Sequence, residues 1–240
     1  MKKPTVHADL KLNIGFANIV QINELIEETI ADGFNLIALD RTIGVTDTFR
    51  PSNIDKKPYL ARKVKILERC TVLVKNKAEL NLLKKCKERV READLVALEF
   101  QDADTLEHFL KKFPEWMDNF IYINIATFNL SSYIFKLLKP KEFFIEFDYS
   151  KLFDSTKKKQ AMVNFFRMAD SHLKRLILSS DARDLFDRRA QWEVSEVVND
   201  LFERSEAYST KMVKEMTITN PLELVKRSVV KRQGFAYFSN

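Results

Sequence analysis

Short apolar runs alternate with amphipathic segments along almost the whole chain, and this alternation restricts the folds that the chain can adopt. The strand-like runs cover residues 5–10, 34–40, 65–74, 94–100, 120–125, 143–147 and 175–178. The segments between them carry apolar residues at helical spacing, as Ile22, Leu25 and Ile26 do. Strands and helices in strict alternation predict a parallel sheet with right-handed crossovers.

The predicted helices have recognisable starts and apolar stripes. Asn18 and Gln21 form a capping box at the start of the first helix, and Gly33 ends it. Later helices are predicted at about 77–90, 103–112, 130–138 and 156–173, with a further stripe from Val194 to Phe202. The run 34–40 is almost entirely apolar, which is typical of a parallel strand covered on both faces.

About seven strands, each followed by a helix, favour a single β/α barrel similar to a TIM barrel, with an open doubly wound sheet as the alternative. No Pro/Gly-rich linker divides the chain, so we predict one domain over residues 1–228 and a basic tail over 229–240. No apolar run approaches the roughly 18 residues of a membrane span, and we expect a soluble intracellular protein without membrane contact.

The basic charge is concentrated in two segments. Residues 41–69 hold eight basic residues against three acids, and the tail from Lys226 adds four basic residues and no acid. Such clusters favour binding to a polyanion, because each neutralised phosphate releases counterions. A solvated surface is the alternative. The candidate RNA-binding residues of the first segment are Arg41, Arg50, Lys56, Lys57, Arg62, Lys63, Lys65 and Arg69.

Further RNA-binding candidates lie after the seventh strand, at a helix start and in the tail. They are Arg183, Arg188, Arg189, Lys157, Lys158, Lys159, Lys231 and Arg232. Three lysines at a helix N-terminus oppose the helix dipole, so phosphate binding would explain them better than helix stability. Phe49 and Tyr59 lie in the first basic segment, where they either stack on unpaired bases or plug the end of the barrel.

Signatures of catalysis are scarce. The chain lacks a glycine-rich phosphate loop, a GxSxG elbow, HExxH and CxxC, and Cys70 and Cys86 are too isolated for a zinc site. The one enzyme-like pattern is His7-x-Asp9, which we place at the end of the first strand, where barrel hydrolases hold metal ligands. Asp9 could instead bond to backbone, and the Ser179–Ser180 pair is typical of a turn.

The polar residues predicted at strand ends form the inventory of a possible site. They are Asp9, Lys11, Asp40, Arg41, Lys75, Asn76, Glu99, Gln101, Asp102, Asp148, Tyr149, Ser179, Ser180, Asp181 and Arg183. No histidine lies among the later ones, and His108 and His172 fall in helices. We therefore predict no catalytic residue, no metal and no cofactor. The alternative is a metal-dependent phosphoesterase that uses His7, Asp9, Asp40 and Asp148.

Seven segments of the chain, taken in order, carry a resemblance to a known family. They are VHADLKL, ADGFNLIALD, RKVKILERCTVLV, ADLVALEF, FIEFDYSKLFDS, RLILSSDARDLFDRRAQWEV and TNPLELVKRS. The chain resembles the barrel-forming protein subunit, of about thirty kilodaltons, of archaeal and eukaryotic RNase P and of RNase MRP. Lys65 and Arg69 fall on basic positions of that family. Arg189 falls on an arginine that the family follows with Gly-Pro-Tyr, where this chain has Ala190, Gln191 and Trp192.

The resemblance implies an incomplete TIM-like β/α barrel without a full metal cluster. It implies a subunit that supports RNA-catalysed removal of the 5′ leader of precursor tRNA, or rRNA precursor processing in RNase MRP. The expected partners are the RNase P or MRP RNA, precursor tRNA and a small RRM-like subunit. The expected location is the nucleus or nucleolus in a eukaryote and the cytoplasm in an archaeon. A protein-interaction module whose basic residues only balance charge is a third hypothesis.

Overall fold

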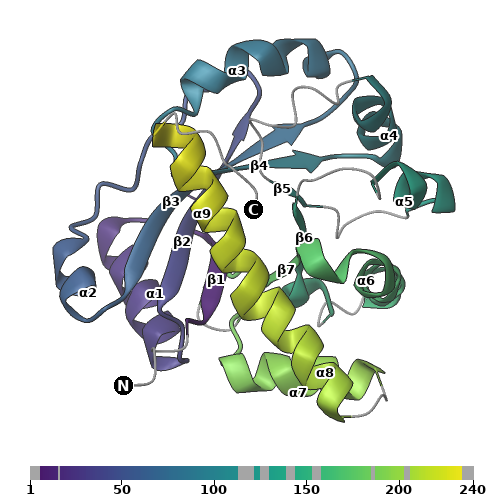
Figure 1. Cartoon of the computed structure of the whole chain (residues 1–240). Helices are drawn as coiled ribbons and strands as arrows, with labels where there is room; N and C mark the ends of the chain where they lie inside the picture. Colours follow the sequence, from purple (N-terminus) through teal and green to yellow (C-terminus); the bar gives the residue numbers. More distant parts are fainter. Residues whose placement is uncertain are drawn as a thin grey trace.

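The computed structural model describes residues 6–15, 17–112, 122–124, 130–138, 144–152, 158–184, 187–202 and 206–233. Seven parallel strands, adjacent in chain order, form one curled sheet (Figure 1). They are β1 (Ala8–Asn13), β2 (Leu36–Gly44), β3 (Lys65–Val74), β4 (Leu95–Phe100), β5 (Tyr122–Asn124), β6 (Phe144–Asp148) and β7 (Leu176–Ser179). The predicted incomplete TIM-like barrel is confirmed.

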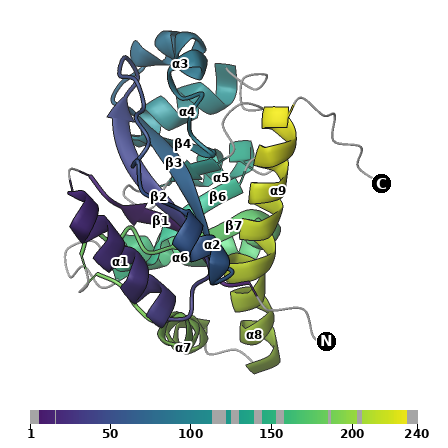
Figure 2. The same cartoon turned by 90° about the vertical axis from the view of Figure 1, so that its left-hand side faces the viewer.

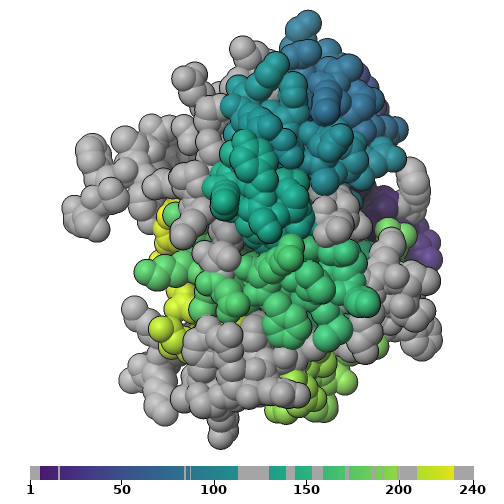
Figure 3. Space-filling view, turned by 90° about the vertical axis from the view of Figure 1, so that its right-hand side faces the viewer, coloured from purple at the N-terminus to yellow at the C-terminus, as the bar shows by residue number. Residues whose placement is uncertain are grey.

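Helices cover the outside of the strands. They are α1 (Ile19–Ala31), α2 (Lys57–Ala61), α3 (Leu83–Arg89), α4 (Ala103–Lys112), α5 (Ser132–Leu138), α6 (Lys158–His172), α7 (Gln191–Phe202), α8 (Glu206–Lys214) and α9 (Asn220–Gln233). The predicted capping box begins α1, since Asn18 Oδ1 accepts the Gln21 amide and Gln21 Oε1 accepts the Asn18 amide. Segments from α4 and α5 lie directly above α6 on one outer face (Figure 3).

The barrel is closed by very little pairing. Strands β1 and β7 lie next to each other, but among the described residues the backbone pairing at this seam is a single bridge from Leu12 to Ala182, just beyond β7. There the Asn13 amide donates to the Ala182 carbonyl at 2.8 Å. A barrel with so little strand pairing at its seam is incomplete, as the family resemblance implied.

Helix α9 covers the amino-terminal opening of the barrel, as Figures 1 and 2 show. Its Leu224 and Val225 join an apolar cluster with residues from the first half of six strands. The Asn220 side chain donates to the carbonyls of Leu173 and Leu176, and Ser228 Oγ donates to the Asp94 carbonyl. The helix thus seals one end of the barrel.

The basic tail does not begin where we predicted. Helix α9 runs to Gln233, so residues 229–233 are helical and continue the helix that covers the barrel. The rest of the predicted tail lies outside the described residues. Within the described part of the chain, no helix has both the length and the apolar character needed to cross a bilayer.

Candidate functional site

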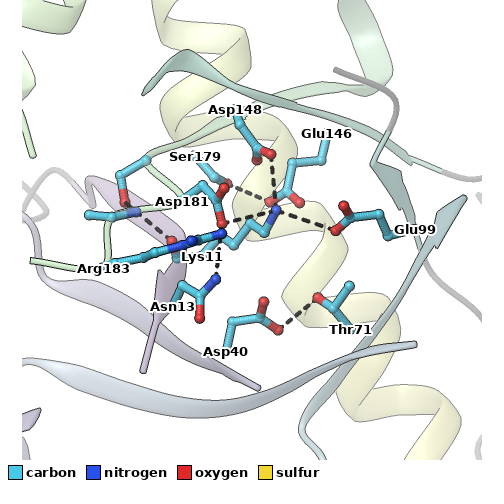
Figure 4. A network of polar contacts seen from close by, with 12 residues as sticks. Lys11, Asn13, Asp40, Thr71, Glu99, Glu146, Asp148, Ser179, Asp181 and Arg183 are labelled. Atoms are coloured by element: carbon cyan, nitrogen blue, oxygen red, sulfur yellow. Dashed lines mark hydrogen bonds and ion pairs between the residues drawn. The ribbon is translucent and has the colours of Figure 1, made fainter. Parts of the chain in front are cut away.

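The interior of the barrel changes character along the strands. Alternate side chains of a strand point to the same face, and the first inward residues are apolar, such as Leu36, Ala97 and Ile177. The last inward residues are polar, and most are charged (Figure 4). This mouth cluster consists of Lys11, Asp40, Arg69, Thr71, Glu99, Glu146, Asp148, Ser179 and Asp181.

Lys11 occupies the centre of the mouth cluster, although its side chain is only 2% exposed. Its Nζ lies 2.9 Å from Asp148 Oδ2, 3.2 Å from Asp181 Oδ1 and 3.8 Å from Glu99 Oε2. Burial opposes the charged form, but the carboxylates of Asp148 and Asp181 outweigh it and hold the pKa of Lys11 well above its usual value. The ammonium group is therefore an internal cation that these carboxylates share.

A bulge in β1 allows Lys11 to reach this place. Ala8 and Asp9 pair with Leu36 and Ile37, but Leu12 pairs with Leu39, so β1 contains one extra residue. An extra residue shifts the alternation of side chains by one position. Lys11 can therefore point into the barrel although its neighbour Leu10 also packs inside. We predicted Lys11 after the first strand; it lies within that strand.

Arg69 is the second internal cation, and it is fully buried. Its Nη1 and Nη2 donate to Glu146 Oε1 and Oε2 at 2.7 and 2.6 Å, and its Nε lies 3.2 Å from Asp40 Oδ1. The prediction that Arg69 binds RNA is wrong for this conformation, because its position on β3 directs the side chain into the barrel and away from any phosphate.

The carboxylates of the mouth cluster respond differently to their surroundings. Burial raises the pKa of Asp40 to about 6, against the opposing effects of Arg69 and Lys11. Burial acts in the same direction on Asp181, but Lys11 and Lys151 outweigh it and lower the pKa of Asp181 well below its usual range. Thr71 Oγ1 donates to Asp40 Oδ1 at 2.7 Å, and Ser179 Oγ donates to Glu146 Oε1 at 2.6 Å.

The His7-x-Asp9 pattern does not lie where we predicted. Strand β1 begins at Ala8, so His7 precedes it at the amino-terminal end, opposite to the mouth. Asp9 Oδ1 accepts the amides of Ser180 and Lys11, which confirms the alternative that Asp9 bonds to backbone. In the part of the chain that the structure describes, no three His, Cys, Asp or Glu side chains are arranged to hold a metal ion.

The serine pair also matches its alternative interpretation. Ser180 Oγ accepts the Ala182 amide at 3.1 Å, which makes a local turn. Ser179 Oγ donates to Glu146 in the mouth cluster. Neither serine is exposed, since Ser179 is 1% and Ser180 0% accessible. The pair therefore supports the seam and the mouth of the barrel.

The first basic segment does not form one surface. Arg41 lies in the carboxyl-terminal half of β2, where its Nη1 donates to the Arg50 carbonyl at 3.1 Å, and the Arg50 side chain is exposed. Lys57, Lys63 and Lys65 are exposed too, but Lys65 begins β3 at the amino-terminal end. The candidates therefore divide between the two ends of the barrel.

Besides Arg69, two further cations of this segment are engaged by acids. Lys56 Nζ lies 3.1 Å from Glu68 Oε1, and Glu68 also accepts the Ser52 amide and hydroxyl. Arg62 forms an exposed pair with Glu27 at 2.7 Å. These contacts attach the segment to β3 and α1, and they reduce the charge available for an external anion.

Phe49 and Tyr59 are 2% and 6% exposed and pack in two apolar clusters. Stacking on RNA bases is therefore excluded for them in this fold. Neither residue belongs to the apolar cluster inside the end of the barrel, so the alternative that they plug that end is not what the structure shows. Tyr59 lies against α1, where its hydroxyl donates to Asn23 Oδ1 at 3.0 Å.

The candidates after β7 are also divided. Arg183 is exposed, whereas Arg188 is 8% exposed and donates to Asp32 Oδ2 at 2.6 and 3.1 Å. Arg189 is half-buried, and its Nη1 donates to the Arg188 carbonyl. Arg188 therefore holds the loop against α1 instead of presenting its charge to RNA.

The remaining candidates belong to α6 and the tail. Lys159 is exposed on α6. Lys157 and the side chains of Lys158, Lys231 and Arg232 lie outside the described residues. The exposed candidates for which the described part of the chain shows no ion pair are Arg50, Lys57, Lys63, Lys65, Lys159 and Arg183.

A family model shows which protein family the chain belongs to. The family described as RNase P subunit p30 matches residues 8–232. The chain belongs to this family. Its function is thus that of a protein subunit of RNase P. No curated protein shows significant similarity to the chain in sequence.

Solved structures share the fold of this RNase P subunit p30 member. A chain of archaeal ribonuclease P, solved with mature tRNA, matches with a TM-score of 0.63 and 12% identity over 97% of this chain and 96% of that one. An organophosphorus hydrolase from Deinococcus radiodurans matches with a TM-score of 0.59, at 12% identity over 92% of each chain. A histidinol phosphate phosphatase from Lactococcus lactis, solved with zinc, matches with a TM-score of 0.52, at 13% identity over 96% of this chain and 94% of that one.

Proposed function

We propose that this RNase P subunit p30 member is a non-catalytic subunit that binds the RNA of RNase P and supports removal of the 5′ leader of precursor tRNA. The observation that carries the non-catalytic role is the mouth cluster. Active sites of β/α barrels lie at the carboxyl ends of the strands, and here Lys11 and Arg69 already form ion pairs with Asp148, Asp181 and Glu146 at that place. An enzyme would need those groups available for substrate or metal.

The RNA-binding role is supported by the exposed cations. Arg50, Lys57, Lys63 and Lys65 have no acidic partner in the described structure, so a phosphate can approach them without breaking an ion pair. The archaeal structure of similar fold contains tRNA, which agrees with a place for this chain in an RNA–protein particle. Other subunits of the particle, including a small RRM-like one, are proposed partners. A second role in RNase MRP and a nuclear location also remain predictions.

RNA binding can be tested by titrating the full chain with its RNase P RNA at several salt concentrations. We expect Lys57→Ala with Lys65→Ala to reduce the log–log salt slope by about 0.7–0.9 for each phosphate that the chain no longer neutralises. The matched control is Lys211→Ala with Lys214→Ala, which removes two exposed charges of α8. An unchanged slope in the first variant, or equal reductions in both, would contradict the assignment of Lys57 and Lys65 to RNA binding.

The non-catalytic role needs a separate assay. We expect the purified chain to leave a generic phosphodiester intact at any concentration of Mg²⁺, Mn²⁺ or Zn²⁺, and the reconstituted particle to process precursor tRNA. The opposite outcome is hydrolysis that co-purifies with the isolated chain and is lost in Asp148→Asn. That result would show that the mouth cluster is catalytic.

A further inference from the structure

A cleft of about 500 Å³ opens beside the seam of the barrel. Its lining includes the apolar residues Ile14, Ala17 and Leu25, and Gln21, Glu24 and Arg183 provide polar groups. Clefts of roughly 300–1,000 Å³ with an apolar lining and a few polar groups are typical sites for small ligands. The volume is therefore large enough for a single nucleotide.

The cleft lies beside the last contact of the seam. The Asn13 amide bonds across the seam to Ala182, and the next amide, that of Ile14, donates to the Asp40 carbonyl on the β2 side. Gly15 then turns the chain with a φ of +42°, in the left-handed region that favours glycine. Residues of the loop after β1 and of the loop after β7 both line the cleft. Figure 4 shows Asn13 and Arg183 at that edge of the mouth cluster.

Unlike the charged groups inside the barrel, Arg183 and Glu24 of the cleft are available to bind a ligand. Arg183 and Glu24 are exposed, and neither forms an ion pair in the described part of the chain. Gln21 uses its Oε1 to accept the Asn18 amide, so its side-chain nitrogen can still donate. Asp184 also lines the cleft, but its Oδ1 accepts the Asp187 amide of its own loop.

These groups match the parts of one nucleotide. An arginine suits a phosphate, because its planar fork can form two parallel hydrogen bonds. A carboxylate such as Glu24 accepts hydrogen bonds, and the Watson–Crick edge of guanine offers two adjacent donors, N1–H and the N2 amino group. Unpaired RNA bases are commonly recognised on that edge. The apolar residues of the lining can contact the face of the base.

We propose that the cleft receives one unpaired guanine nucleotide of the bound RNA, with the base edge on Glu24 and the phosphate on Arg183. This assignment rests on the proposed RNA-binding function and adds to it a base preference at a defined place. The preference belongs to the cleft, whereas the exposed lysines of α2 and β3 bind phosphates of any sequence.

The test uses the full chain and two fluorescent heptamers of uridine, one with a central guanosine and one with a central adenosine. We expect the wild-type chain to bind the guanosine heptamer about tenfold more tightly, since one bidentate base contact discriminates by that order. Glu24→Gln should abolish the preference, because an amide presents only one acceptor. Arg183→Ala should weaken both heptamers by the same factor.

Matched controls are Glu196→Gln on α7 and Arg91→Ala before β4, which change exposed groups outside the cleft and should leave the preference intact. Equal binding of the two heptamers by the wild type, or a preference that survives Glu24→Gln, overturns the assignment. If long RNA is still bound with a steep salt slope, the proposed function stands while this inference fails. Free guanosine monophosphate that binds as tightly as the heptamer would indicate a free-nucleotide site and also overturn it.

Discussion

The two halves of the barrel interior use the same strands in opposite ways. Toward the amino-terminal end, inward side chains are apolar, and α9 seals them with Leu224 and Val225. Toward the mouth, the inward side chains are charged, and Lys11 and Arg69 pair with the surrounding carboxylates. The apolar half is what any folded core requires. The ionic half resembles the layout of a catalytic barrel, but its carboxylates form ion pairs with cations of the chain itself.

The difference shows how a barrel can have carboxylates at its mouth, as a catalytic barrel does, while those carboxylates are engaged in structural ion pairs. A buried carboxylate is unstable unless a cation or hydrogen bonds compensate it, so the mouth must contain some positive group. A bound metal would supply that charge from outside the chain. Here Lys11, Arg69 and Lys151 supply positive charge from within the chain, and the cations left for external anions lie on the surface. Three measurements test this difference between the two halves.

The largest effect is expected in the ionic half. Arg69→Leu leaves Glu146 and Asp40 buried without their cation, and breaking a buried pair costs about 3–5 kcal/mol of the free energy of unfolding. Urea denaturation monitored by circular dichroism measures this loss. Arg69→Leu combined with Glu146→Leu should recover part of it, because the unpaired charge is then gone.

A loss below about 1 kcal/mol in Arg69→Leu would mean that the ion pair is not structural. The matched control is Arg50→Leu, which removes an exposed arginine and should leave the free energy of unfolding within about 0.5 kcal/mol of the wild type.

A smaller effect is expected in the apolar half. Leu224→Ala removes a fully buried side chain of α9 and should cost about 2–4 kcal/mol in the same denaturation experiment. Val229→Ala, on the same helix but 38% exposed, is the control and should change little. A negligible loss in Leu224→Ala would show that α9 does not seal the barrel.

Much of the fold could be predicted from the sequence, because it depends on local patterns. Apolar runs and helical stripes located seven strands and most helices, and the Asn18–Gln21 capping box matches the start of α1. The β1 prediction ended at residue 10, three residues early, because Lys11 and Asn13 are polar and a polar residue normally marks the end of a buried strand. Only their partners on β6 and after β7 make those positions compatible with a strand.

The candidate site was harder to predict, because it depends on contacts between distant segments. Arg69 was assigned to RNA on its charge and on its match to a basic position of the family, whereas its alternation with Leu67 and Thr71 places it inside the barrel. Glu146 was missed altogether, although a carboxylate in the middle of the apolar run FIEFD is a signal of a buried ion pair. The bulge that directs Lys11 inward left no local sign in the sequence.

The smallest effect is a pH dependence of the free energy of unfolding, which we expect for the ionic half of the barrel interior and not for the apolar half. The pKa of Asp40 in the folded chain is about 6, above the 3.8 of an ordinary aspartate, so between about pH 4 and 6 the folded state binds more protons than the unfolded state. Stability then falls as the pH rises through that window, and the penalty is complete above it. Asp40→Asn removes this titration, so its stability relative to the wild type should improve by roughly 1–2 kcal/mol from pH 4.5 to pH 7.5. Leu224→Ala removes no titrating group, and its loss should be the same at both pH values. If Asp40→Asn behaves like Leu224→Ala in this respect, Asp40 is ionised at no unusual cost, and the mouth is better neutralised than its burial implies.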